Sequence, residues 1–411
     1  MIRKAPPVDP ESVEIGRRAG MIRRRRGLSQ DVVAGLAGIS KQYVSMLEGG
    51  KRRFVRRGLL EDLAGALGCS VVDLTGEPYL AVDRATADAL AAMPELAVAL
   101  YEPTPTSDIS ARPVTRLVHA VAQANEHCEE TRYALACRDL PALLTELAAH
   151  AATGNGDTRR AALAGLMEGC VVAFGATRHL GRTELAIQAA WRAQEAAGLL
   201  GDPALTGFAT LIRASAFSRL GARRAAAGVL ADAFAAIEPE VDPTGHDTQA
   251  AEACGVMHLL SAQLAARDGR ADDADARIAE AAALASATGE RNTLQWHFGP
   301  ANVTAWSLSI AVETQRGPGV AERIDANLPQ AASAGRRSRL HLDLARGYAQ
   351  AEGARDAEAI RHLDTADRIA PQRIRNDPIA RELVADLNRR ARRRVWELDS
   401  LCNRFGMNTK R

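Results

Sequence analysis

At 411 residues the chain exceeds what one hydrophobic core usually supports, so at least two structural units are expected. Only 4% of the residues are aromatic while alanine and leucine dominate, which favours many thin helices over a β-sandwich. The six cysteines form no CxxC pair, and no uncharged apolar run reaches the roughly 18 residues of a membrane span. We therefore expect a cytoplasmic protein with reduced thiols and no membrane partner.

The net charge of +2 conceals a strong asymmetry along the chain. Residues 1–57 carry 14 Lys and Arg against 5 Asp and Glu, and residues 368–411 carry 12 against 5. The middle, 58–367, carries 26 against 40. A cationic head on an acidic body is typical of nucleic-acid binding proteins, although arginine-rich helix faces can also be simply solvated.

The first predicted helix covers 15–26, because Ile15, Ala19 and Ile22 fall on one face. Ser29 is a natural N-cap for a second helix, and Gly38 marks a sharp turn that favours positive φ. A third helix, KQYVSMLEG, follows the cap Ser40 and points Val44 and Leu47 inward, and further helices are predicted over 57–67 and from Ser70.

The stretch GLSQDVVAGLAGISKQYVSMLEGGKR, followed by LLEDLAGALGCSVVDL, resembles the Cro/phage-repressor (XRE) helix-turn-helix domain. The resemblance covers 15–75 and includes the small Ala34 where two helices cross. It implies a five-helix DNA-binding domain over 1–80, with double-stranded DNA as the partner. One reading helix contacts too few base pairs for specificity, so we expect a homodimer on two half-sites.

The family's roles transfer to matching positions of this chain. Gln30 matches a glutamine that binds a phosphate and supports the reading helix, and Ser40 caps that helix. Lys41 and Gln42 match the residues that face bases, whereas Tyr43 either packs on the fourth helix or reaches a phosphate. The predicted DNA-binding set is Gln30, Ser40, Lys41, Gln42, Tyr43, Ser45, Met46, Lys51, Arg52 and Arg53.

After a predicted linker with a short helix over 81–112, alanine-rich segments are broken by glycines at positions 181, 221, 269, 317 and 353. The rhythm resembles a tetratricopeptide-like α-solenoid over 113–411, with a plain helical bundle as the alternative. The predicted fold is all-α, a helix-turn-helix domain followed by this solenoid. Such a combination is similar to the peptide-pheromone-sensing (RRNPP) regulators of Gram-positive bacteria and to a set of actinomycete regulators. The resemblance implies a peptide or small-molecule ligand.

The segment 292–313 concentrates polar and aromatic groups, and from Pro300 onward they recur along one helix face. Peptide-sensing relatives use asparagines on inner helices, so Asn302 is the first candidate. The predicted ligand-binding residues are Gln295, His297, Asn302 and Trp306. His258 and Trp191 could line the same groove, but the sequence alone does not place them. The alternative is that Trp296, Phe298 and Trp306 fill the core.

The chain contains no P-loop, GxSxG or HExxH motif, so we expect no enzymatic activity, cofactor or metal. The sequence predicts a ligand-sensing transcriptional regulator. The alternative is a scaffold whose solenoid docks a partner protein, with DNA binding only for localisation. A deep polar groove near Asn302 would favour sensing, and an open apolar face would favour docking. NRRARRRVWELDSL is predicted to form one amphipathic helix that buries Leu387, Val395 and Leu398.

Overall fold

The computed structural model describes residues 10–52, 57–69, 71–76, 84–102, 110–329, 333–391, 393 and 395–407. Within these ranges the chain is helical and has no β-strand, apart from one isolated bridge between Arg291 and Phe298. The all-α prediction is therefore confirmed.

Residues 10–76 hold the five helices of the head, α1 (Pro10–Arg25), α2 (Gln30–Ala37), α3 (Lys41–Glu48), α4 (Arg57–Leu67) and α5 (Val71–Thr75). Ser29 and Ser40 cap α2 and α3 as predicted, each accepting a hydrogen bond from the backbone three residues on. Gly38 ends α2 with φ of +65°, a conformation that glycine adopts without strain. Val44 and Leu47 are fully buried between α3 and the other helices of the head.

The segment predicted as a linker contains two helices, α6 (Arg84–Ala91) and α7 (Met93–Tyr101). Their Ala89, Met93 and Leu96 are buried in the main hydrophobic core. Only the short helix was predicted here, and α7 was missed; its Pro94 occupies the first turn, where proline costs no hydrogen bond.

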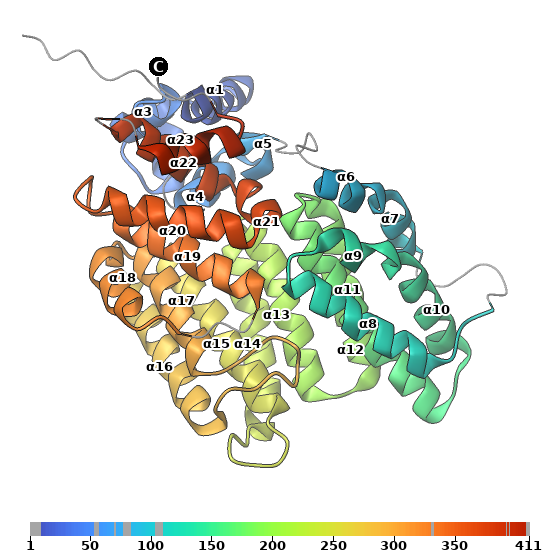
Figure 1. Ribbon diagram of the computed structural model, residues 1–411. Helices are drawn as coiled ribbons and strands as arrows, with labels where there is room; N and C mark the ends of the chain where they lie inside the picture. Colours follow the sequence, from blue (N-terminus) through green and yellow to red (C-terminus); the bar gives the residue numbers. More distant parts are fainter. Residues whose placement is uncertain are drawn as a thin grey trace, which may run out of the picture.

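The body continues through α8 (Val114–Glu129), α9 (Tyr133–Arg138) and α10 (Leu140–Thr153) into five antiparallel hairpins. Their helices are α11 (Gly156–His179) with α12 (Thr183–Leu200), α13 (Pro203–Arg219) with α14 (Arg223–Ile237), α15 (Gln249–Arg267) with α16 (Ala271–Thr288), α17 (Pro300–Glu313) with α18 (Gly317–Ala326), and α19 (Ala334–Ala349) with α20 (Asp356–Ile369). A short 3-10 turn, η1 (Glu238–Glu240), follows α14. Neighbouring hairpins pack side by side, so the body is a helical-repeat solenoid (Figure 1).

Each of the five predicted glycines lies at the turn or the start of the second helix of a hairpin. Gly181, Gly221, Gly269 and Gly353 have positive φ, as such tight turns require. Gly317 serves differently, since it opens α18 where a Cβ would lie 2.9 Å from the Cα of Gly347. Here glycine permits two helices to approach closely.

The chain ends in α21 (Pro371–Arg375), α22 (Pro378–Arg390) and α23 (Trp396–Arg404). The single C-terminal helix that was predicted is thus wrong, because the chain leaves helical geometry after Arg390. Leu387 and Leu398 are buried as predicted, whereas Val395 is only partly buried.

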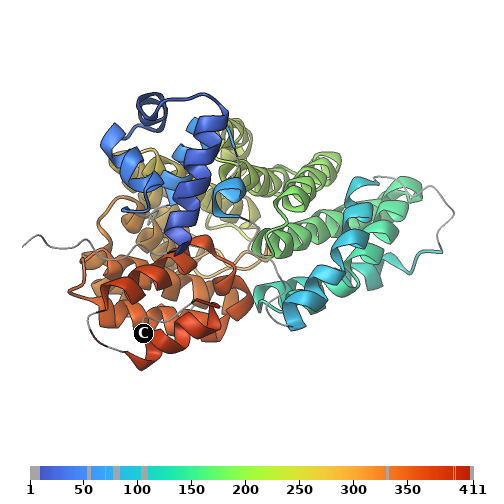
Figure 2. The ribbon, with the colours of Figure 1, turned by 90° about the horizontal axis from the view of Figure 1, so that it is seen from above.

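The head rests on the body and on these last helices. In α4, Glu61 is fully buried and pairs with Arg267 at 3.1 Å, while Asp62 pairs with Arg223. Ile379 of α22 joins the hydrophobic cluster of the head. Figure 2 shows the head and the C-terminal helices at one end of the molecule and α6–α10 at the other.

One described helix, α11, is long and apolar enough to cross a membrane by composition. In the structure it is a core helix, because 67% of its most apolar window is buried against other helices.

Candidate nucleic-acid interface and central cavity

The outward face of α3 is open to solvent. Lys41, Gln42 and Ser45 are exposed, while Tyr43 and Met46 are partly buried, with Tyr43 packed against the core of the head. Figure 1 places α3 at the opposite side of the molecule from α16. The first turn of α3 is therefore accessible to a large partner.

Glu48 at the end of α3 fixes that helix against α1 and α2. Its carboxylate accepts two hydrogen bonds from Arg23, at 2.5 and 2.9 Å, and one from the Gln30 amide at 2.9 Å. Burial alone would raise the pKa of Glu48, but Arg23 and Gln30 outweigh it and the pKa is lowered. Gln30 thus supports α3 through its side chain, and the predicted phosphate contact remains a prediction.

The cationic residues of the interface differ in their surroundings. Lys41 donates to Asp31 at 2.7 Å, but both side chains are about 60% exposed, so this pair exchanges easily with water or another partner. Lys51 and Arg52 are exposed after α3. Arg53 lies outside the described residues.

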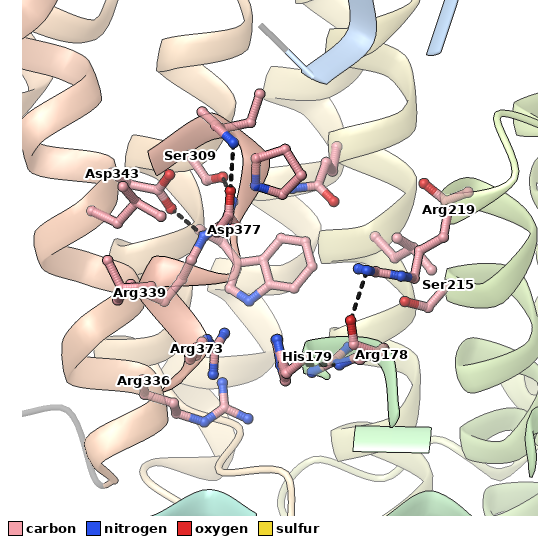
Figure 3. A pocket seen from close by; sticks show the side chains of 18 of the residues that line it. Arg178, His179, Ser215, Arg219, Ser309, Arg336, Arg339, Asp343, Arg373 and Asp377 are labelled. Carbon is pink, nitrogen blue, oxygen red and sulfur yellow. Dashed lines mark hydrogen bonds and ion pairs between the residues drawn. The ribbon is translucent and has the colours of Figure 1, made fainter. Parts of the chain in front are cut away.

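A cavity of about 250 Å³ lies between the body and the head (Figure 3). Leu60 of α4 and Val71 and Thr75 of α5 line it from the head, and helices of the body together with α21 and α22 line the rest. Among the latter, α17 contributes Asn302 and Trp306. The head is therefore part of the cavity wall.

Two of the four predicted ligand-binding residues lie in this cavity. Asn302 is 7% exposed and its Oδ1 accepts from Arg336 at 2.8 Å, while its Nδ2 has no hydrogen-bond partner in the part of the chain that the structure describes. Trp306 lines the same space.

Gln295 and His297 lie elsewhere. Gln295 hydrogen-bonds with Asn125 at 2.7 Å and Glu168 at 3.3 Å, outside the cavity lining. His297 lines a separate shallow hollow beside Pro300. The structure thus brings Asn302 and Trp306 together and separates Gln295 and His297 from them.

His258 and Trp191, whose place the sequence left open, do not line the cavity. His258 packs against the Phe234 ring at 4.6 Å, where burial lowers its pKa to about 4. Trp191 lies under the Arg213 guanidinium at 4.0 Å. Of the predicted core aromatics, Phe298 is buried, while Trp296 both packs on Phe208 and lines the cavity.

Sequence reasoning missed the arginines of the cavity. Six line it, namely Arg178, Arg219, Arg267, Arg336, Arg339 and Arg373, together with the carboxylates of Glu129, Asp343 and Asp377. Arg267 pairs with Glu61, and Arg339 pairs with Asp343 at 2.7 Å. Asp377 caps α22. The available signal was the excess of arginine over carboxylates in 368–411, which does not say which arginines point inward.

Comparison with known proteins bears on the head alone. A helix-turn-helix domain family matches residues 14–75. No curated protein matches the chain. A solved structure that matches is Bacillus thuringiensis PlcR in complex with the peptide PapR7 and DNA, at 13% identity and a TM-score of 0.29, covering 87% of this chain and 94% of that one. So loose a superposition carries no argument about the body. The family match and the geometry agree that residues 14–75 form a helix-turn-helix domain.

Proposed function

We propose that the protein is a cytoplasmic transcriptional regulator that binds double-stranded DNA through α3 and senses a ligand in the central cavity. One observation carries the proposal. The helix-turn-helix domain exposes the outward edge of α3, and other helices of the same domain form part of the cavity wall.

On DNA, the first turn of α3 would enter the major groove. Lysine can donate to O6 and N7 of guanine, and glutamine can pair with N6 and N7 of adenine, which suits Lys41 and Gln42. Met46 could touch a thymine methyl group, with Ser45 beside it. Lys51, Arg52 and Arg53 would contact phosphates and add affinity without reading sequence.

In the cavity, a ligand would act on the head through direct neighbours. Leu60, Val71 and Thr75 face the cavity, and Arg267 both lines it and holds Glu61 of α4. A ligand that fits one position of the head better than another shifts the population toward that position. In a homodimer the shift would change the spacing of the two α3 helices, and hence the fit to two half-sites.

The alternative function, a docking scaffold, would call for an open apolar face on the solenoid. The cavity beside Asn302 instead combines apolar side chains with arginines and carboxylates, and it is bounded by the head. A concave site with convergent polar groups on an apolar lining favours a small ligand over a docked protein.

The test is a selection of genomic DNA fragments by the purified full-length protein, with and without a small-molecule extract of the source cells. The proposal predicts enrichment of an inverted repeat with half-sites about one helical turn apart, and a change in enrichment with the extract. Recovery no better than random fragments, even in dilute buffer, would overturn it.

A further inference from the structure

Three cavity arginines come from helices that are far apart in the sequence. Arg178 lies at the end of α11, Arg336 in the first turn of α19, and Arg373 in α21. Figure 3 shows them together with His179 around one side of the cavity. Only tertiary stacking brings these charges together.

Among the residues that the structure describes, none of the three forms an ion pair with a carboxylate. Arg178 donates from Nε to His179 Nε2 at 3.2 Å and lies 5.0 Å over the Phe174 ring. Arg336 donates to Asn302 and to the backbone carbonyl of Trp296. The lining carboxylate Glu129 acts on Arg178 and Arg336 through its charge only, and it accepts a hydrogen bond from Ser333 at 2.8 Å.

The electrostatics of the cluster reflect this lack of a direct ion pair. Burial, reinforced by Arg373, lowers the pKa of Arg178 to about 10. Burial also lowers the pKa of Arg336, and the charge of Glu129 offsets that effect only in part. Burial and the same arginines hold the pKa of His179 well below its usual value, so the ring is neutral and accepts from Arg178. Guanidinium groups keep their charge at neutral pH, so the cluster is a concentrated positive charge.

Two buried polar atoms of this cluster have no hydrogen-bond partner among the described residues, Asn302 Nδ2 and Arg336 Nε, and both are donors. The half-buried Arg373 guanidinium also makes no hydrogen bond to those residues. Gly335 leaves space for the Arg373 side chain, because a Cβ at position 335 would lie 2.9 Å from Nη1 of Arg373. A set of buried donors without acceptors calls for a ligand rich in acceptors.

We propose that the cavity binds its ligand by a compact anionic group, a carboxylate or a phosphate, held by Arg336 and Arg373 with support from Arg178 and Asn302. The guanidinium fork suits both groups because it can donate two parallel hydrogen bonds to either. The rings of Trp296 and Trp306 would cover the remainder of the ligand. The volume suits a small molecule or one end of a longer one.

This inference rests on the proposed sensing function, and its test measures anion binding apart from DNA binding. Full-length protein is titrated with inorganic phosphate or with succinate at constant ionic strength, followed by tryptophan fluorescence and melting temperature. At least one anion should shift both signals saturably. A response to phosphate alone indicates a phosphoryl ligand, and a response to succinate alone a carboxylate.

Arg373→Gln is the main variant because its side chain makes no hydrogen bond that the fold needs. It should weaken anion binding at least about tenfold. The free variant should melt no lower than wild type, since one of three like charges is removed. Arg336→Gln should weaken binding as well, whereas Arg337→Gln, exposed on the same helix, should bind as wild type.

Two results would overturn the anion site: both anions act no differently from sodium chloride, or the Arg336 and Arg373 variants bind like wild type. If neither anion binds but selected DNA does, the proposed anion site is wrong and the proposed regulator function is retained. If an anion binds through Arg373 and operator affinity does not change at saturation, the site stands and sensing falls.

Discussion

The two ends of α19 carry arginines in opposite situations. Near its end, Arg346 is 5% exposed and pairs with Glu313 at 2.9 Å and Asp343 at 2.7 Å, both 2% exposed. Although burial acts against it, these carboxylates raise the pKa of Arg346. Near its start, Arg336 forms no ion pair with a carboxylate among the described residues, and burial, only partly offset by the charge of Glu129, lowers its pKa. The same residue type on one helix thus has its charge balanced at one end and unbalanced at the other.

This difference distinguishes charged groups that stabilise the fold through ion pairs from charged groups that are available to bind a ligand. The Arg346 network ties α19 to α17 and satisfies its own charges. The head shows the same division, since Glu48 is satisfied by Arg23 and Gln30 while Gln42 is exposed without a hydrogen-bond partner among the described residues. We infer that the unmatched groups are the binding groups.

The largest effect on stability is expected when the ion-pair network of Arg346 is broken. Arg346→Leu leaves the buried Glu313 without its ion-pair partner and Asp343 with Arg339 alone, and should lower the free energy of unfolding by about 3–5 kcal/mol. Urea denaturation measures the loss. Arg337→Leu, exposed on the same helix, should change stability by less than about 0.5 kcal/mol. Equal losses in the two variants would contradict the comparison.

Acid should break the same network in the wild-type protein. Burial would raise the pKa values of Glu313 and Asp343, but the neighbouring arginines outweigh it and both are lowered. Groups with depressed pKa contribute stability above their unfolded values of 4.5 and 3.8, and lose it as pH falls through the lower folded values. Melting temperature against pH, in wild type and Arg346→Leu, should show a steeper acid loss in wild type. Parallel curves would show that the network does not titrate as described.

A smaller effect, on DNA binding, is expected at the exposed edge of α3. Gln42→Ala should cost about 1–3 kcal/mol in binding to the selected operator, with little change on random DNA, because a base contact is lost. Fluorescence anisotropy on the two duplexes gives the difference. An equal loss on both would mean that Gln42 reads no base.

The smallest effect is expected from the charges that follow α3. Replacing Arg52 and Arg53 by alanine should weaken binding similarly on all sequences and flatten the dependence of log K on log salt by about 2, since two phosphate contacts are lost. Titrations at several salt concentrations measure the slope. An unchanged slope would remove both residues from the phosphate contact.

The features of this molecule that can be predicted from the sequence are those determined by residues close together along the chain. The Ser29 and Ser40 caps, the Gly38 turn and the turn glycines depend on local backbone geometry, which a short stretch determines. Asn302 and Trp306 were found because both lie on one face of α17. Gln295 and His297 precede that helix with positive φ, so helical spacing did not apply to them.

The cavity cluster could not be predicted in this way. Arg178, Arg336 and Arg373 lie on three helices that meet only when the hairpins stack. Arg337, the neighbour of Arg336, points to solvent, and nothing local distinguishes the two. Which charges converge is a property of the tertiary fold.

The central claim, that the exposed edge of α3 contacts DNA, is tested most directly by thiol protection. Ser45→Cys places a reactive thiol on that edge, and Ser286→Cys places one on the exposed face of α16 as a control. With selected operator DNA at saturation, maleimide should modify the first thiol far more slowly than without DNA, and the second at an unchanged rate. Modification of both thiols at unchanged rates while the DNA is bound would contradict the account.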